Sequence, residues 1–154
     1  MRGGVMKAEI KQKWVNALRS GDYTQGRWKL SRIDDYTDIM GEGFECHCVL
    51  GVLADLAAKE GIISYGYDRD TDCEAIMTEF RVYSDPTYAD EETGYDPNVE
   101  GIHLPISVAR WAGLDETVPY IPHPSTGEET LISELNDGGS LSFGQLADLI
   151  EKHL

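Results

Sequence analysis

The sequence predicts an α+β fold, in which three to five α-helices pack on a small antiparallel β-sheet within one domain. Apolar residues recur with helical spacing near both ends of the chain and before Gly61. β-branched and aromatic residues alternate in the segments ISYGY and EAIMTEFRVYS, as in strands. A chain of 154 residues is long enough for a single hydrophobic core, and it contains no internal repeat. We therefore expect residues 1–154 to form one globular domain, with residues 1–6 flexible and residues 85–101 in an acidic loop.

The first two elements precede a polar turn. A helix is predicted over Ala8–Ser20, because its apolar residues share one face and its basic residues lie outside that face. Gly21 supplies the C-terminal stop. A short strand is predicted over Arg27–Ile33, where large and polar residues alternate before the turn DDYTDIMGEG.

The middle of the chain contains a second predicted helix, over Cys46–Lys59, which Gly61 ends. Its apolar residues cover nearly the whole circumference, so we expect it to be central and buried. Two strands are predicted next, in ISYGY and in Glu74–Ser84. The following acidic segment has two prolines and no periodicity, which indicates an exposed loop.

Three further elements follow the acidic loop. A short helix should begin near Pro105 and end before Gly113. The stretch VPYIPHPSTGEE is predicted to be extended, and Thr130–Leu135 to form one or two helical turns. Ser142 and Gln145 have the spacing of a capping box, which predicts the start of a last amphipathic helix.

Charge is distributed unevenly along the chain, whose formal net charge at pH 7 is −15. Residues 1–32 hold eight Lys or Arg and two acids, whereas the remaining residues hold five basic and 26 acidic residues. No Lys or Arg occurs between Arg81 and Arg110. An acidic field of this size repels nucleic acid and anionic membranes and attracts basic partners. We therefore expect the partner-binding surface in the acidic loop, at Asp85, Asp90, Glu91, Glu92, Asp96 and Glu100.

Composition favours a soluble protein of the cytoplasm. No apolar run approaches the roughly 20 residues of a membrane-spanning helix, and the N-terminus MRGGVMKAEI lacks the pattern of a secretory signal. The three cysteines cannot all pair within one chain, which a reducing compartment explains most simply.

Several segments match motifs of a known group of proteins. They read KQKWVNALRSGDYTQGRWKL, CVLGVLADL, LPISVARWAGL and, near the C-terminus, LNDGG followed by SF and LADLIE. Over most of its length, apart from about residues 62–101, the chain resembles a family of small uncharacterised proteins of tailed phages and prophages. The resemblance implies a viral protein in the cytoplasm of a host cell, and it implies no particular chemistry.

The sequence Cys46-His47-Cys48 raises three interpretations. Structural zinc sites use four ligands, usually in pairs separated by two or more residues, and this spacing is wrong for them. A thiolate at a helix N-terminus is activated by the helix dipole, so Cys48 is the candidate nucleophile. The chain order Cys48, His103, Asn136 then matches that of a papain-like triad. The third interpretation, a buried structural thiol on an apolar helix, is favoured.

Two other segments suggest ligands. Asp68, Asp70, Asp72 and Glu79 occupy the first, third, fifth and twelfth positions of a helix-loop-helix calcium loop, but Cys73 replaces the required glycine and the flanks read as strands. A solvated acidic hairpin is therefore favoured over a metal site. The basic N-terminal region contains aromatic and polar side chains that could stack on a nucleotide and pair with it: Tyr23, Gln25, Arg27 and Trp28. The alternative is that these side chains pack against the first helix.

Three functional hypotheses follow, with no cofactor in any of them. The first is a phage-encoded acidic accessory protein that binds and inhibits a basic host protein, such as a nucleic-acid-binding protein, as in counter-defence or host takeover. The second is a sponge for a small signalling nucleotide, acting as a homo-oligomer. The third is a papain-like thiol hydrolase that uses Cys48. The first is favoured, so we expect a binding protein and not an enzyme.

Overall fold

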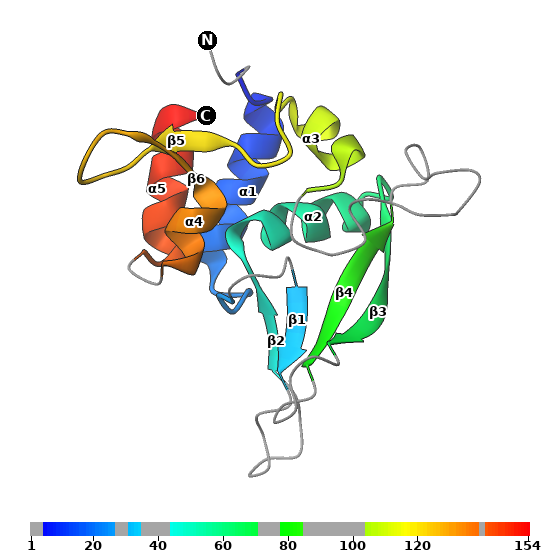
Figure 1. The fold of residues 1–154 in the computed structure, drawn as a ribbon. Coiled ribbons are helices and arrows are strands. Elements are labelled where there is room, and N and C mark those ends of the chain that lie inside the picture. Colours follow the sequence, from blue (N-terminus) through cyan, green and yellow to red (C-terminus); the bar gives the residue numbers. More distant parts are fainter. Residues whose placement is uncertain (1–4, 27–30, 35–43, 71–77, 85–103, 139–140) are drawn as a thin grey trace.

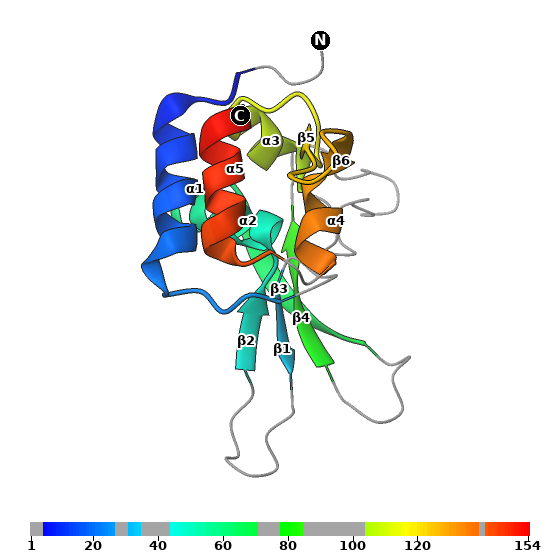
Figure 2. The same ribbon diagram turned by 90° about the vertical axis from the view of Figure 1, so that its left-hand side faces the viewer.

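The helices gather at one end of the molecule, and a β-sheet extends from the other (Figures 1 and 2). The computed structural model describes residues 5–26, 31–34, 44–70, 78–84, 104–138 and 141–154. Helix α2 lies where the helices meet the sheet (Figure 1). The fold is α+β, as predicted. In chain order the elements are α1 (Ala8–Ser20), β1 (Ser31–Asp34), β2 (Phe44–His47), α2 (Val49–Lys59), β3 (Ser64–Asp70), β4 (Thr78–Ser84), α3 (Ile106–Ala112), β5 (Tyr120–Pro122), β6 (Glu129–Leu131), α4 (Ile132–Asp137) and α5 (Phe143–His153).

The larger sheet has four strands in the order β2-β1-β4-β3, and every neighbouring pair is antiparallel. Its longest ladder joins β3 to β4, with Ser64 opposite Ser84 and Asp70 opposite Thr78. A second sheet consists of the antiparallel pair β5 and β6. Strand β2 is therefore an edge of the larger sheet, and its last residue, His47, leads into α2.

Helix α2 is the centre of the hydrophobic core, as its all-round apolar sequence predicts. All its residues from Val49 to Asp55 are buried, and so is Ala57. Trp14 of α1 is fully buried and donates its indole Nε1–H to the carbonyl oxygen of Val49 at 2.9 Å. The other core residues that lie on helices come from α1, α3, α4 and α5. The first and the last helix therefore pack in the same core.

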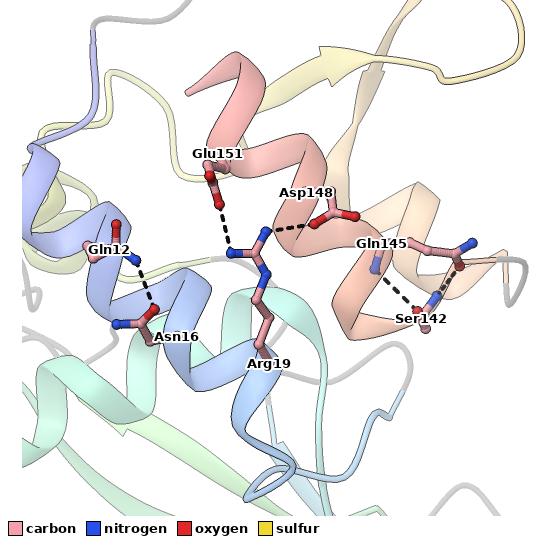
Figure 3. Close-up of polar contacts among 7 residues, drawn as sticks. All are labelled: Gln12, Asn16, Arg19, Ser142, Gln145, Asp148 and Glu151. Atoms are coloured by element: carbon pink, nitrogen blue, oxygen red, sulfur yellow. Dashed lines mark hydrogen bonds and ion pairs between the residues drawn. The ribbon is translucent and has the colours of Figure 1, made fainter.

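Three predicted helices are confirmed together with their termini. Helix α1 spans Ala8–Ser20, and α3 ends at Ala112, before Gly113. Helix α5 begins with the predicted capping box, in which the Ser142 hydroxyl accepts from the N–H of Gln145 and the Gln145 side chain accepts from the N–H of Ser142 (Figure 3).

Two predicted boundaries are wrong. The second helix begins at Val49 and not at Cys46, because Cys46 pairs with Arg32 and His47 with Ser31 across β1 and β2. The fourth helix begins at Ile132 and not at Thr130, because Thr130 pairs with Ile121 in the smaller sheet. In both places, pairing with another strand takes residues that the local pattern assigns to a helix.

The predicted strands are present with shifted limits. The first runs over Ser31–Asp34, the strand at ISYGY extends to Asp70, and the third is observed from Thr78. Residues 27–30 and 74–77 of these predictions lie outside the described residues.

Helices α1 and α5 are side by side and joined by ion pairs (Figures 2 and 3). The Arg19 guanidinium lies 2.6 Å from an oxygen of Asp148 and 2.7 Å from an oxygen of Glu151. On the exposed side of α1, Gln12 donates to Asn16 at 2.8 Å. Part of the basic charge of the N-terminal region is therefore neutralised by the acidic C-terminal helix.

Met6 departs from the flexible terminus expected for residues 1–6. Its side chain is 1% exposed, and its N–H donates to the carbonyl oxygen of Leu154 at 3.2 Å. The next N–H, of Lys7, donates to the carbonyl oxygen of Ala112 at 2.8 Å. Burial of the side chain and these two hydrogen bonds hold the chain in place just before α1.

Candidate functional site

Residues 22–26, here called the strap, connect α1 to the β1 region and lie along the end of β2. Gly21 has a φ of 80°, a conformation that glycine adopts without steric cost, and it turns the chain out of α1. The N–H of Gly26 donates to the carbonyl oxygen of His47 at 2.7 Å, and the N–H of His47 donates to the carbonyl oxygen of Thr24 at 2.8 Å. The strap thus forms a parallel bridge on the outer edge of β2.

Gly26 allows the strap to approach β2 closely. A Cβ atom built on Gly26 would lie 2.7 Å from the Cβ of Cys46, a distance at which one of the two residues must move. Gly26 is buried, and so is Cys46, which forms no disulfide and is 8% exposed. The strap therefore covers Cys46.

A phenol, a carboxylate and an ammonium group meet where the strap crosses α2. The Tyr23 hydroxyl donates to Asp55 Oδ2 at 2.5 Å, and Lys59 Nζ lies 3.1 Å from the Tyr23 hydroxyl and 3.2 Å from Asp55 Oδ2. The Asp55 side chain is only 8% exposed. Burial and the hydrogen bond to Asp55 raise the pKa of Tyr23, and the hydrogen bond with Tyr23 raises the pKa of Lys59. The phenol and the ammonium thus both stay protonated at neutral pH.

His47 adjoins this group. Its side chain is buried, and its ring meets the Tyr23 ring edge to face, with centroids 5.0 Å apart. Burial lowers the pKa of His47 from 6.5, and the Lys59 ammonium lowers it further, while the Asp55 carboxylate opposes the shift. The imidazole is therefore neutral at pH 7.

Asn136 holds the other end of the strap from a fully buried position at the end of α4. Its Nδ2 donates to the carbonyl oxygen of Gly26 at 2.8 Å and to Asp137 Oδ1 at 3.1 Å. Its Oδ1 accepts from the N–H of Val49 and from Gln25 Nε2, both at 3.2 Å. One side chain thereby joins the strap, α4 and the first turn of α2.

Cys48 lies at the N-terminus of α2, as the nucleophile hypothesis requires, but it is buried. Its sulfur accepts from the N–H of Gly51 at 3.4 Å and so serves as the N-cap. Burial raises the pKa of Cys48 from 9.0 to about 12, against the opposing effect of the Gly51 hydrogen bond. A thiol in this state is protonated at neutral pH, so its environment favours the structural interpretation. Val49, the next residue, binds Asn136 through its N–H; His103 lies outside the described residues.

We predict that Cys48 is unreactive in the native protein at pH 8. A rise of three pKa units reduces the thiolate fraction on the order of a thousandfold. Iodoacetamide should therefore label Cys48 at least several hundred times more slowly in the native protein than in urea, as measured by mass spectrometry of the Cys48 peptide. Rapid native labelling would restore the nucleophile hypothesis.

The nucleotide-binding hypothesis receives little support from the two of its residues that are described. The Tyr23 hydroxyl is bound to Asp55 and Lys59, and Gln25 Nε2 donates to Asn136 and, at 2.9 Å, to the carbonyl oxygen of Leu141. Both side chains thus hold the strap in place. Arg27 and Trp28 lie outside the described residues.

The predicted acidic sites fall mainly on residues that the structure does not describe. Asp72 is one of them, as are the partner-binding residues Asp85, Asp90, Glu91, Glu92, Asp96 and Glu100. Asp68 and Asp70 lie in β3 and Glu79 in β4, which pair as antiparallel strands and not as the helices that flank a calcium loop. Among the described side chains, no group of three or more His, Cys, Asp or Glu is placed to bind a metal ion.

Sequence reasoning missed the roles of His47, Asp55 and Lys59. The one available signal is Asp55, the sole charged residue within α2 before Lys59. A carboxylate on a helix that is buried all round requires a partner. The sequence does not reveal that this partner is Tyr23, which lies 32 residues earlier.

The model of one protein family matches residues 6–154, and its description is a domain of unknown function, DUF8296. The chain belongs to this family. Neither the curated proteins nor the solved structures contain a match. In the part of the chain that the structure describes, no helix has both the length and the apolarity needed to cross a membrane.

Proposed function

We propose that this protein is a binding protein, and not an enzyme, that docks through an anionic surface on a basic protein and inhibits it. The observation that carries the proposal is the charge of the segment from Trp111 to Glu151. This segment contains eight acidic residues and no Lys or Arg. It includes β5, β6, α4 and nearly all of α5, which contact one another in the fold.

Six of these acids have exposed side chains, and we call them the acidic surface: Asp115, Glu128, Glu129, Glu134, Asp148 and Glu151. Arg19 neutralises part of the charge of the last two. Glu128, from the β5–β6 hairpin, and Glu134, from α4, take no part in these ion pairs. A field of this sign steers cationic surfaces toward the protein and is screened by salt.

The condition of the other candidate groups also favours binding over catalysis. Cys48 is buried and protonated, and Tyr23, Asp55 and Lys59 are bound to one another. Such mutual contacts are typical of groups that stabilise a structure. We infer a viral accessory protein of the counter-defence or host-takeover type, acting in the cytoplasm of the host cell. Its partner would be a protein whose own ligand is anionic, such as nucleic acid.

The decisive experiment is affinity capture from host extract with charge-reversed variants. We predict that the double variant Glu128→Lys, Glu134→Lys loses at least about tenfold in affinity for the captured partner. The unsubstituted protein should release the partner between about 0.1 and 0.5 M salt, the range in which salt screens surface charges. The control variant Glu9→Lys, Asp22→Lys changes the net charge equally at exposed positions near the two ends of α1.

Equal losses of affinity in both variants would mean that net charge alone acts, and not the acidic surface. A partner that stays bound in about 0.5 M salt would contradict an electrostatic interface, because the Debye length is then only a few ångströms. The inhibitory part is tested separately, by assaying nucleic-acid binding of the captured protein with and without this chain. Undiminished nucleic-acid binding would contradict inhibition.

A further inference from the structure

The strap is fastened at three places. Tyr23 binds Asp55 and Lys59, the backbone of Thr24 and Gly26 binds His47, and Gln25 and Gly26 bind Asn136. The first two places share one feature, since His47 supplies the backbone groups of one and packs its ring against the tyrosine of the other. A change at His47 therefore acts on both of them.

The surroundings of His47 accept a neutral ring more readily than a charged one. Among the described groups, the charges that act on it come from α2, and they are the Asp55 carboxylate and the Lys59 ammonium. The strap adds the neutral phenol of Tyr23. Asp55 is already engaged by Tyr23 and Lys59, so a second cation would compete with Lys59 for the same carboxylate.

We propose that the strap is a proton-sensitive latch: protonation of the buried His47 ring releases residues 22–26 from β2 and α2 and uncovers Cys46, while the helices stay folded. Release is local because contacts outside the strap also join the helices. Trp14 binds Val49, and Arg19 binds α5, from outside it. The Asn136 contacts keep the latch closed at neutral pH.

The direction of the pH effect follows from the burial of His47, which holds the pKa of its imidazole below 6.5. The unfolded or released form then binds a proton more readily than the closed form. The free energy that the neutral His47 ring contributes to closure is complete above pH 6.5. It is lost as the pH falls through the lower pKa that His47 has in the closed form. The latch therefore opens on acidification.

The test uses Cys46 as the reporter, in a background of Cys48→Ser and Cys73→Ser. The probe is 4,4′-dithiodipyridine, which reacts with thiols in mildly acidic solution. The quantity measured is the protection factor, which is the reaction rate of urea-unfolded protein divided by that of native protein at the same pH. We expect this factor to fall between pH 7.5 and pH 5, mainly below pH 6.5. The fall should be up to about tenfold per pH unit, because that is the largest effect of a single linked proton on the opening equilibrium. Far-UV circular dichroism should stay unchanged.

Matched histidine variants identify the group responsible. His47→Gln should abolish the pH dependence of protection, whereas His153→Gln, at an exposed position at the end of α5, should retain it. Tyr23→Phe should lower protection at both pH values, because it removes the hydroxyl that binds Asp55 and Lys59.

If the His47→Gln variant fails to fold, a measurement on the reporter protein alone still tests the proposal. The midpoint of the loss of protection should coincide with the titration of the His47 ring protons, followed by NMR. The proposal is overturned by a constant protection factor, by a loss of protection that occurs only together with loss of helical signal, or by an unchanged pH dependence in folded His47→Gln. None of these results bears on the acidic surface, so the latch and the proposed function are tested independently.

Discussion

Replacing Asn136 with alanine should lower the free energy of unfolding by about 3 kcal/mol or more, as measured by urea denaturation. The substitution leaves the carbonyl oxygen of Gly26 and the N–H of Val49 without their side-chain partner. A buried polar group that loses its partner costs about 1–3 kcal/mol, and two such groups lose theirs here. Because Asn136 is fully buried, water cannot replace the amide without a rearrangement.

Asn16→Ala is the matched control for this prediction. Asn16 is exposed on α1, where its side chain accepts one hydrogen bond from Gln12 (Figure 3). Its loss should change the free energy of unfolding by no more than about 0.5 kcal/mol. Similar effects of the two substitutions would show that the Asn136 contacts contribute little beyond those of a surface amide.

Trp14→Ala should destabilise the protein by about 4 kcal/mol, which is typical of a large aromatic side chain removed from a core. Trp14, on α1, is fully buried, and the substitution leaves a cavity and removes the hydrogen bond to the carbonyl oxygen of Val49 in α2. Thermal denaturation followed by circular dichroism measures the loss. Trp14→Phe, which retains most of the apolar contact, should cost only about half as much.

Trp111 provides the comparison for Trp14. It is partly exposed and lines a surface pocket beside Ile10, so Trp111→Ala removes fewer buried contacts. We expect about half the effect of Trp14→Ala or less, since the cost of truncation follows the apolar area buried. Equal losses at both positions would contradict the central place given to Trp14.

The elements that the sequence predicts best are those with local signals. Helix α1 has a helical stripe and a terminal glycine, and α5 has a capping box, so both could be delimited from neighbouring residues alone. The start of α2 could not, because Cys46 and His47 pair with β1, about fifteen residues earlier in the chain. Nothing in the local pattern separates these two residues from the apolar helix that follows.

The same limit applies to the candidate site. The chemistry of Tyr23 and Gln25 makes both candidate binding residues, and the structure brings both into hydrogen-bonded groups. Their partners, Asp55 and Asn136, lie on other helices, and the sequence carries no sign of these pairings. Spacing along the chain predicts which face a side chain occupies, but it does not predict which distant polar group will meet it there.

The contact between α1 and α5 bears on how the protein is made. The inner face of the first helix is completed by the last one, and Met6 is joined to Leu154. During translation, α1 emerges long before residues 143–154 exist, so its apolar side chains must wait in a partly exposed state. Closure of so long a segment is also entropically costly and slows folding. A nascent chain arrested before α5 should accordingly expose apolar side chains of α1 to chaperones.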